Sequence, residues 1–285
     1  MANPQDYITG INPTWCQGCG NFGIWAGIRR ALVKLDYQPY QLALFHDIGC
    51  CGNGANWYNT YGFHSLHGRA LPAAVGAKLA NHKLVVLALT GDGGGYGEGG
   101  NHFIYTCRSN INVTMIVHNN QLYSLTTGQA SPTAAQGTKT KSTPAGSLEV
   151  DFKPLQVAIS CGATFVARAY ADDMQHLEMV LEKAVLHQGF SLVDILQPCP
   201  TFNKSQTRQW YQDKIYHLED QNWDPKDKEK ALAKAAEWGV RIPLGIFYQE
   251  NRPTYEQQLP QLKAKTLVEQ GAKPVDIKEF LAELK

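Results

Sequence analysis

The sequence predicts an α/β fold in which a mostly parallel sheet is flanked by helices and followed by a C-terminal arm. Short apolar, β-prone runs alternate with segments long enough for helices, and this alternation is typical of βαβ units. Charge is unevenly distributed: residues 1–204 carry 13 basic and 12 acidic side chains, whereas residues 205–285 carry 13 of each. We therefore expect one main domain over 1–204 and a charged helical arm over 205–285.

Five apolar runs are expected to form the sheet: residues 42–45, 84–89, 113–117, 164–166 and 192–196. The intervening segments that fit helices are residues 23–35, 70–80, 101–107 and 174–187, and 226–238 fits an exposed helix of the arm. Parallel sheets bind ligands beyond the carboxyl ends of their strands. The three loops 46–56, 91–100 and 118–133, which follow the first three runs, are therefore the expected ligand site.

The composition excludes several classes of partner. With 26 Lys and Arg against 25 Asp and Glu, the net charge is +1, which favours neither nucleic acid nor an anionic membrane as partner. The longest apolar run, 84–89, is too short to span a bilayer, and the N-terminus has no signal-peptide pattern. Seven cysteines, an odd number, indicate reduced thiols rather than a disulfide framework. We expect a soluble, cytoplasmic protein.

The second apolar run is followed by a glycine-rich segment, with seven glycines in the eleven residues from Gly91. A strand, a glycine loop and a helix start present free N–H groups to an anion. Asp92 among these glycines can hold a divalent cation that bridges two phosphates. Taken alone, the pattern fits a tight turn capped by Asp92 better than a phosphate site.

The third apolar run leads into His118-Asn119-Asn120, and this second element changes the interpretation. Asn120 lies 28 positions beyond Asp92, and one βα unit separates them. Two adjacent strand ends can therefore present the Asp92 carboxylate, the Asn120 amide oxygen and a following carbonyl to one Mg²⁺, which prefers hard oxygen ligands. The alternative for Asn119 and Asn120 is an ordinary strand-terminal turn.

Four of the cysteines lie in loops at the expected crevice: Cys16, Cys19, Cys50 and Cys199. Four thiolates from three loops can enclose a 4Fe-4S cluster, but a structural zinc needs the same number of ligands, so the cysteines alone do not choose. Cys51 adjoins Cys50 and could replace it as a ligand. Cys107 and Cys161 fit small buried side chains.

A set of motifs occurs in order along about residues 10–205: Trp15-Cys-Gln-Gly-Cys-Gly20, Asp47-Ile-Gly-Cys50, Phe63-His-Ser-Leu-His-Gly-Arg-Ala70, Gly91-Asp-Gly93, Ile116-Val-His-Asn-Asn120, Leu125-Thr-Thr-Gly-Gln-Ala-Ser-Pro-Thr133 and Pro198-Cys-Pro-Thr201. Together they resemble the β subunit of the 2-oxoacid:ferredoxin oxidoreductases. The resemblance implies a thiamine-diphosphate-binding fold, with a domain of the diphosphate-binding type.

The resemblance also implies a set of site residues. A 4Fe-4S cluster would be held by Cys16, Cys19, Cys50 and Cys199. Mg²⁺ would be held by Asp92, Asn120 and the main-chain carbonyl of Leu122. Thiamine diphosphate would contact Ile48, Gly49, Cys50, Cys51, His67, Gly91, Asp92, Gly93, Gly94, Asn120, Leu122, Ser124 and Leu125. His67 and Asn119 are the expected catalytic residues.

The implied activity is oxidative decarboxylation of a 2-oxoacid, pyruvate or 2-oxoglutarate, to an acyl-CoA and CO₂. Coenzyme A would be a co-substrate, and electrons would pass through the cluster to ferredoxin. An α subunit would supply the pyrimidine-binding domain and an activating Glu, so the chain should be inactive alone and should assemble as αβ or (αβ)₂.

The chain departs from the family pattern at Gly94, where relatives commonly have Asp, at Ser124, where they have Gly, and at Thr127, where some have Lys. His64 fits either a pocket neighbour of His67 or a packed histidine, and Arg69 fits either an anion ligand or an intersubunit ion pair. The first alternative function is a non-redox thiamine-diphosphate decarboxylase or carboligase with structural or zinc-binding cysteines. The second is a dinucleotide-binding regulatory module, although residues 91–100 do not form a G-x-G-x-x-G fingerprint that is followed about 20 residues later by a ribose-binding acid after the next strand, since that strand ends in Asn119-Asn120.

Overall fold

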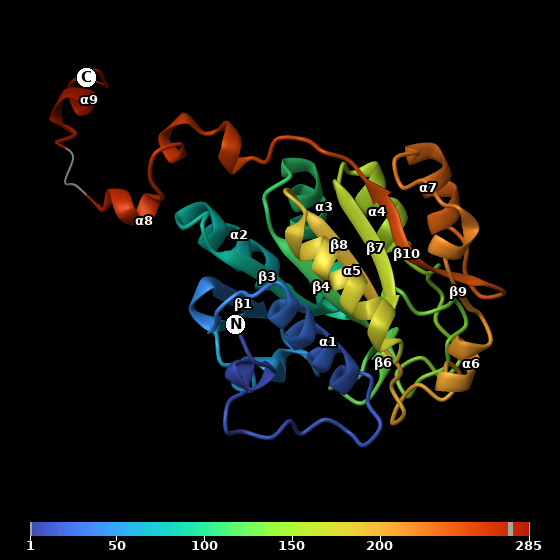
Figure 1. The fold of residues 1–285 in the computed structure, drawn as a ribbon. Helices are drawn as coiled ribbons and strands as arrows, with labels where there is room; N and C mark the ends of the chain where they lie inside the picture. The colour runs from blue at the N-terminus through green and yellow to red at the C-terminus, as the bar shows by residue number, and fades with distance from the viewer. Residues whose placement is uncertain (1, 273–275, 285) are drawn as a thin grey trace.

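The computed structural model describes residues 2–272 and 276–284, and its centre is an eight-stranded sheet with helices on both faces (Figure 1). The strand order is β2-β1-β3-β4-β8-β7-β10-β9, and all neighbouring pairs are parallel except β7 with β10. The strands are β1 (Leu42–His46), β2 (Tyr61–His64), β3 (Val85–Gly91), β4 (Thr114–Asn119), β7 (Phe165–Tyr170), β8 (Ser191–Leu196), β9 (Ile215–His217) and β10 (Ile242–Gln249). The predicted α/β class with a mostly parallel sheet is confirmed.

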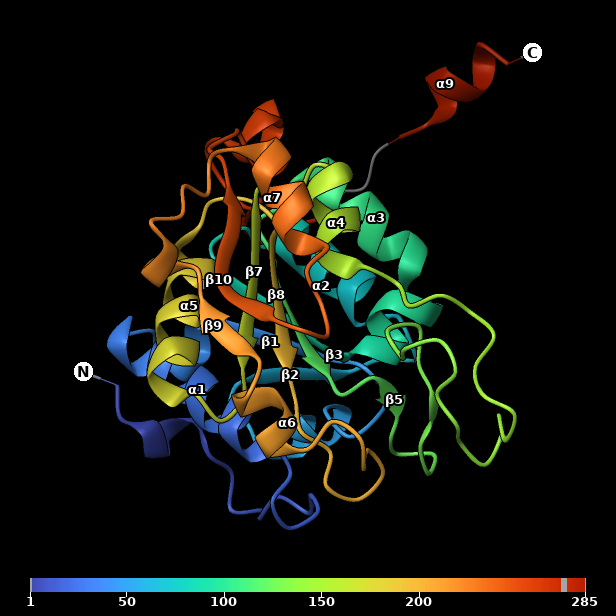
Figure 2. The same cartoon turned by 90° about the vertical axis from the view of Figure 1, so that its right-hand side faces the viewer.

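The helices form one layer on each face of the sheet (Figures 1 and 2). One layer contains α1 (Asn21–Lys34) and α5 (Met174–Leu186), and the other contains α2 (Ala70–Ala80), α3 (Gly100–Ser109), α4 (Pro154–Ser160) and α7 (Lys228–Ala235). Successive strand side chains alternate between the two apolar cores, as Leu87 and Ala88 do. A strand covered on both faces needs a continuous apolar run, which explains why the central strands were predictable.

The layer of α1 and α5 packs tightly because small residues allow close approach. The apolar positions of α5 recur at helical spacing, and Asp173 caps the helix by accepting a hydrogen bond from the His176 backbone N–H at 3.3 Å. At Gly23 of α1, a Cβ atom would lie 2.1 Å from the Ala171 carbonyl oxygen. Only glycine therefore fits where α1 meets the loop after β7.

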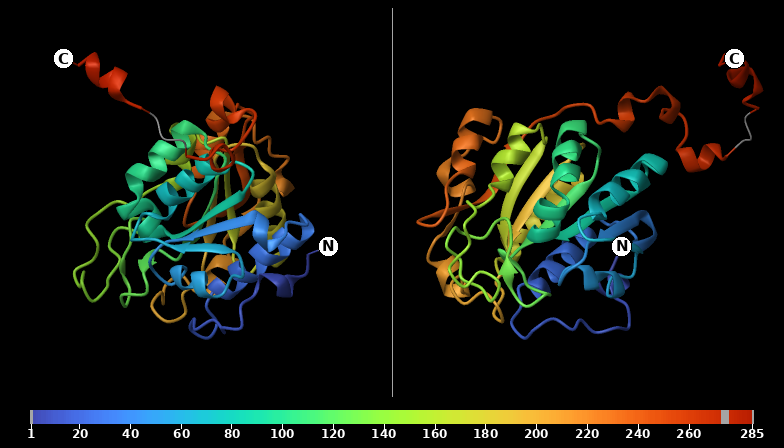
Figure 3. Two further views of the ribbon diagram at one scale, coloured as in Figure 1. Left: turned by 90° about the vertical axis from the view of Figure 1, so that its left-hand side faces the viewer. Right: turned by 180° about the vertical axis from the view of Figure 1, so that it is seen from behind.

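The segment after residue 204 differs from the expected arm. Its strands β9 and β10 extend the main sheet, and Ile242–Tyr248 within β10 is buried throughout. The expected charged helix at 226–238 corresponds to α7, which packs on α4. α8 (Leu267–Gln270) lies beside α2 through the Lys83–Glu269 ion pair, and α9 (Lys278–Ala282) projects away from the sheet (Figure 3). No helix among the described residues is long and apolar enough to cross a membrane.

The close contact at Gly23 leads to a test of the packing. Gly23→Ala should destabilise the fold by about 1–3 kcal/mol, because the added methyl group collides with backbone rather than with a movable side chain. Gly76→Ala, in the exposed part of α2 with open space around its Cβ position, should instead stabilise the helix by about 0.5–1 kcal/mol. Opposite shifts of the melting temperature are expected, and equal shifts would contradict the packing described for α1.

Candidate functional site

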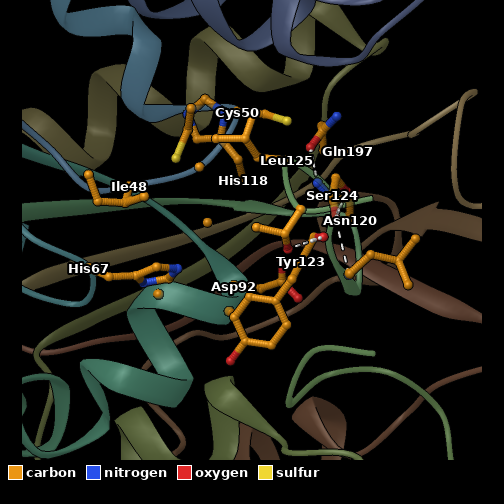
Figure 4. Close-up of a pocket in the computed structure, with 17 residues that line it drawn as sticks. Ile48, Cys50, His67, Asp92, His118, Asn120, Tyr123, Ser124, Leu125 and Gln197 are labelled. Atoms are coloured by element: carbon orange, nitrogen blue, oxygen red, sulfur yellow. Dashed lines mark hydrogen bonds between the residues drawn. The ribbon is translucent and has the colours of Figure 1, made fainter. Parts of the chain in front are cut away.

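A pocket of about 510 Å³ opens at the carboxyl ends of β1, β3, β4 and β8 (Figure 4). All thirteen residues that the resemblance assigns to cofactor binding line this pocket. The sequence did not single out four further lining residues, which are His118, Tyr123, Thr126 and Gln197. The structure thus brings together segments that are up to about 150 residues apart in the sequence.

The buried carboxylate of Asp47 connects three segments that shape the pocket. Its Oδ1 accepts hydrogen bonds from the backbone N–H groups of Ile48 and Gly68, each at 2.7 Å, and its Oδ2 accepts one from Thr90 Oγ1 at 2.7 Å. The residue is 1% exposed. The ends of β1 and β3 and the turn before α2 are therefore held by one charged group, and hydrogen bonds to a charged acceptor are stronger than neutral ones.

Residues Gly93–Glu98 of the glycine-rich segment form a π-helical turn. The backbone of this turn approaches neighbouring side chains closely. A Cβ atom at Gly94 would lie 2.5 Å from Asp47 Oδ2, and one at Gly93 would lie 2.4 Å from the Tyr123 ring. The departure from the family pattern at Gly94 therefore has a steric reason in this chain. A π-turn at this place is consistent with a functional site, where such turns are frequent.

Asp92 precedes this turn and presents a buried oxygen atom to the pocket. Its Oδ2 accepts hydrogen bonds from Ser131 Oγ and from Thr133 Oγ1, the latter at 2.7 Å, whereas Oδ1 has no hydrogen-bond partner among the described residues. Burial raises the pKa of Asp92 to about 6, although the two hydroxyl hydrogen bonds lower it. A buried carboxylate oxygen without a partner fits a site that binds a cation.

Asn120 faces the same pocket with a fixed amide orientation. Its Oδ1 accepts hydrogen bonds from the Leu122 backbone N–H at 3.0 Å and from Ser124 Oγ at 2.9 Å, and its Nδ2 donates to Gln197 Oε1 at 2.7 Å. Gln121 turns the chain with a φ of 62°, which lets Asn120 and Leu122 both line the pocket. The three expected magnesium ligands, Asp92, Asn120 and Leu122, therefore share one pocket.

Asn119, which we expected to be catalytic, is not among the residues that line this pocket. Its Nδ2 donates to Asp194 Oδ1 at 3.0 Å, and its Oδ1 accepts from Thr133 Oγ1 at 3.1 Å. Because Thr133 also donates to Asp92, Asn119 lies beneath the pocket and helps to orient the Asp92 carboxylate. Its placement fits a positioning residue rather than a catalytic one.

His67 lines the pocket and is half exposed, with Nδ1 3.4 Å from Glu98 Oε2 and 3.9 Å from Asp47 Oδ1. His64 lies on the exposed edge strand β2 and does not line the pocket. The Arg69 guanidinium donates to the carbonyl oxygens of Glu98 at 2.8 Å and Gly68 at 3.3 Å. Arg69 therefore fastens the start of α2 to the end of the π-turn.

The four thiols expected to hold a cluster influence one another electrostatically. Burial raises the pKa of Cys19 to about 12, and the thiols of Cys199, Cys50 and Cys16 raise it further. Burial, with Cys199 and Cys16, likewise raises the pKa of Cys50 to about 11. The Cys16, Cys50 and Cys199 thiols are therefore each near enough to Cys19 to affect its pKa. The Cys51 thiol is influenced by Asp47, Cys50 and Asp92 instead, and it lines the pocket.

The three loops that carry these thiols are tied together. Trp15 Nε1 donates to the Cys50 carbonyl oxygen at 2.6 Å, and the Gly20 N–H donates to the Pro198 carbonyl oxygen at 3.0 Å. A Cβ atom at Gly20 would lie 2.8 Å from the Pro198 ring. The edges of Phe22, Trp25 and Trp57 surround the Trp15 ring. The four thiols, carried by three loops that these hydrogen bonds join, match the donor set of both a structural zinc ion and a 4Fe-4S cluster.

Gln197 joins the two halves of the site, and the sequence interpretation missed it. Its Nε2 donates to Cys19 Sγ at 3.2 Å while its Oε1 accepts from Asn120. His118, also in the pocket, lies 2.8 Å from Asn21 Oδ1 through its Nδ1. The signal that could have identified Gln197 is its position: a polar residue directly after a buried strand, at the same edge as Asp92 and Asn120.

Comparison with known proteins places this site in a family. Residues 47–195 match the C-terminal TPP binding domain of thiamine pyrophosphate enzymes, and residues 199–264 match the C-terminal part of the pyruvate ferredoxin oxidoreductase beta chain. The 2-oxoacid:ferredoxin oxidoreductase subunit beta of Saccharolobus solfataricus is 43% identical over 94% of this chain and 95% of its own length. The chain belongs to the 2-oxoacid:ferredoxin oxidoreductase β subunits.

Other members of the 2-oxoacid:ferredoxin oxidoreductases agree with this assignment. The subunit beta of 2-oxoacid:ferredoxin oxidoreductase 1 of Aeropyrum pernix is 43% identical over 90% of this chain and 84% of its own length. A solved 2-oxoglutarate:ferredoxin oxidoreductase from Magnetococcus marinus, with 2-oxoglutarate, coenzyme A and succinyl-CoA bound, has a TM-score of 0.90 and 34% identity, covering 100% of this chain and 96% of that chain. The family predicted from the motifs is confirmed, and the non-redox carboligase alternative is not supported.

Substitution of Asp47 tests whether its carboxylate organises this β-subunit site. Asp47→Ala should destabilise the fold by roughly 3 kcal/mol or more, because it removes the acceptor of the Ile48 and Gly68 N–H groups and leaves the Thr90 hydroxyl with the Gly91 carbonyl oxygen alone. Asp47→Asn retains an acceptor for the N–H groups and should cost about 1 kcal/mol. Asp213→Ala, an exposed aspartate whose carboxylate accepts from the Gln209 side chain, serves as the control and should change stability by no more than about 0.5 kcal/mol. Equal unfolding midpoints for all three variants would contradict this role.

Proposed function

We propose that this β subunit binds thiamine diphosphate through Mg²⁺ and holds a 4Fe-4S cluster beside it. With an α subunit, it would catalyse the coenzyme A-dependent oxidative decarboxylation of a 2-oxoacid and reduce ferredoxin. The observation that supports this proposal is that the Gln197 side chain forms hydrogen bonds both with Asn120 in the cofactor pocket and with the thiol of Cys19. In this proposal the two centres lie on either side of one side chain.

When bound, thiamine diphosphate supplies the carbanion that adds to the 2-oxoacid carbonyl and accepts the electrons left by loss of CO₂, and the cluster accepts those electrons singly. The residues of this chain would bind and orient the cofactor and the substrate. Asp92 Oδ1, Asn120 Oδ1 and the Leu122 carbonyl would hold Mg²⁺, whose preferred ligands are oxygens. The backbone of the turn that starts at Gly93 would approach the diphosphate, and His67 would donate a hydrogen bond to it or to the substrate carboxylate.

The choice of a cluster over zinc rests on the family and on the surroundings of the thiols. The first family match begins shortly before Cys50, and the second begins at Cys199. Together the two matches include two of the three loops that carry cysteines. Hydrogen bonds to the sulfur atoms are among the features that tune the potentials of iron–sulfur clusters. The Gln197 amide supplies such a bond to Cys19. A redox centre therefore gives this contact a function that a structural zinc would not.

An α subunit is needed to complete the site in this proposal. The edge strand β2 and the turn after it expose large apolar side chains, with Tyr61 62%, Phe63 52% and Leu66 78% exposed. Leu66 directly precedes the pocket residue His67, so a partner that covers this edge would also close the pocket. We propose that this edge is buried against the α subunit, in an αβ or (αβ)₂ assembly.

Composition and turnover of the assembly test the proposed function. The chain should be co-expressed with its α subunit and purified without oxygen, and iron, sulfide and thiamine diphosphate should then be counted. About four iron and four sulfide per chain, with one thiamine diphosphate, are expected. Pyruvate and 2-oxoglutarate should be compared for coenzyme A-dependent ferredoxin reduction. Thiamine diphosphate without iron would overturn the redox function in favour of a carboligase.

Asp92→Asn tests the magnesium site. The variant should bind thiamine diphosphate and Mg²⁺ more than about 100-fold more weakly, since loss of a ligand exceeds the loss seen for an outer partner, whereas iron content should be unchanged. The matched control is Asp151→Asn, outside the pocket. Isothermal titration of the cofactor-free assembly measures both affinities. Retention of the wild-type affinity would contradict Asp92 as a ligand.

The raised pKa of Asp92 gives the wild type a pH dependence. Below about pH 6, protons compete with Mg²⁺ for the carboxylate, so affinity should fall by up to about tenfold per pH unit. Because the pKa of the folded state lies above that of the unfolded state, this group lowers the stability of the metal-free chain as pH rises from about 4 to 6. Asp92→Asn should remove that slope from a plot of unfolding free energy against pH.

The different roles proposed for the neighbouring cysteines Cys50 and Cys51 can be tested by substitution. Cys50→Ser and Cys199→Ser should each lower iron per chain and bleach the cluster absorbance on exposure to air. Cys51→Ser is the matched control and should keep its iron, because the Cys51 thiol lines the pocket and does not contribute to the raised pKa values of Cys19 and Cys50. If Cys51→Ser lost its iron and Cys50→Ser kept it, the cluster ligand would be Cys51 rather than Cys50.

A further inference from the structure

A second group of metal-ligating side chains lies at the start of α5, apart from the pocket and the thiols. Asp173, His176 and His217 each present one ligand atom, and these atoms all lie within 4.8 Å of one another. Asp173 caps α5 and His176 lies in its first turn, and His217 ends β9, beside that turn (Figure 2). The two imidazole rings stack with centroids 4.4 Å apart. Segments about 40 residues apart in the sequence therefore meet here.

His176 is the observation that points to a ligand. It is 8% exposed, and neither of its ring nitrogens makes a hydrogen bond among the described residues. A buried imidazole without a partner costs free energy unless something binds it. The nearest charged group is Glu219, whose Oε2 lies 3.5 Å from His176 Nε2. His217 differs, because its Nε2 is 2.8 Å from Asp173 Oδ2.

The strand beneath the group leaves room for the fourth side chain. Gly245 lies inside β10 with a φ of 122°, and a Cβ atom there would be 2.8 Å from Glu219 Oε2. A glycine within a strand weakens the strand and often marks a place where another group approaches closely. Here the glycine admits the Glu219 carboxylate next to His176. Strand β10, which carries none of the metal-ligating side chains, therefore helps to shape the site.

We propose that His176, His217, Asp173 and Glu219 bind one zinc ion. Two imidazoles with carboxylate oxygens form a donor set typical of zinc, which takes four ligands at about 2.0–2.2 Å. Small rotations of the side chains bring the ligand atoms of Asp173, His176 and His217, now within 4.8 Å of one another, to the spacing that a tetrahedral ion needs, and Glu219, whose Oε2 lies 3.5 Å from His176 Nε2, would supply the fourth ligand. The bound ion gives one ring nitrogen of His176 a partner and binds the adjacent carboxylates.

A zinc ion at this place would fasten β9 and the turn after it to α5. β9 is the terminal strand of the sheet, and among the described strands it pairs with β10 alone. An ion that binds the folded state alone stabilises that state in proportion to its concentration relative to the dissociation constant. The site therefore has a structural role at the sheet edge, separate from the thiamine and cluster centres.

Zinc binding can be measured on the assembly of this chain with its α subunit. The purified wild type would be equilibrated with zinc sulfate, freed of excess metal by gel filtration and assayed for zinc and iron. His176→Gln and His217→Gln should each hold one zinc fewer per chain, with iron and thiamine diphosphate unchanged. His102→Gln, a histidine of α3 far from the group in sequence, is the matched control and should keep the zinc. Zinc should also raise the melting temperature of the wild type and of the control, but not of the two ligand variants.

The identity of the ligands decides between this site and the cysteines. Zinc-edge X-ray absorption should give nitrogen and oxygen ligands only, including two imidazoles. Sulfur ligands, or equal zinc content in the wild type and His217→Gln, would overturn the proposal. If His176→Gln fails to fold, the partly exposed His217→Gln decides the question alone, with circular dichroism as the check of its fold. The iron count separately tests the proposed function, so the two proposals can fail independently.

Discussion

The site depends on one buried charge, the Asp47 carboxylate. Three donors from three segments converge on it, so the ends of β1 and β3 and the turn before α2 are fixed relative to one another. Residues 48–51 are positioned by Asp47 because they follow it directly in the chain. Their side chains lie in two different environments. The pKa of Cys50 is raised by Cys199 and Cys16, whereas that of Cys51 is raised by Asp47 and Asp92 as well as by Cys50. A short loop can divide its side chains in this way only if its starting point is held rigidly.

Polar but uncharged side chains occupy the carboxyl ends of β1 and β4 and the position directly after β8, namely His46, His118 and Gln197. Burial, together with the neighbouring charge of His46, lowers the pKa of His118 to about 3, and burial lowers that of His46 to about 4, so both imidazoles are neutral at pH 7. Gln197 adds a neutral amide that contacts both sides. In the proposed function, a fixed cation beside Gln197 would hold an electron between thiamine diphosphate and the cluster by electrostatic attraction. Neutral, hydrogen-bonded groups avoid this effect while they keep the geometry rigid.

The sequence could predict those parts of the molecule that a local pattern specifies. The five central strands are continuous apolar runs because both of their faces are buried, whereas β2 is exposed and β10 contains Pro243 and Gly245, so neither has that pattern. The three loops after the first apolar runs were predictable as the ligand site because parallel sheets bind ligands at strand ends, whereas His67 was implied only by the family resemblance. Side-chain alternation along β4 places Asn119 on the face of Met115 and Val117, which belong to the core under α2 to α4, so Asn119 does not line the pocket, and its catalytic role stays a prediction. The pairing of Gln197 with Cys19, 178 positions away, has no local signal.

The site contains buried groups that are costly without partners. Asp92 Oδ1 has no partner among the described residues, and burial keeps the thiols of Cys19 and Cys50 protonated at neutral pH by raising their pKa values. The unpartnered carboxylate oxygen lowers the stability of the fold, and in the proposed function metal binding would recover that free energy and release the protons of the thiols. The extensive packing around them, in two apolar cores and the aromatic shell of Trp15, allows the chain to keep this arrangement before the ligands arrive. In the proposed function, the same burial would make the site selective for cations that can replace the protons.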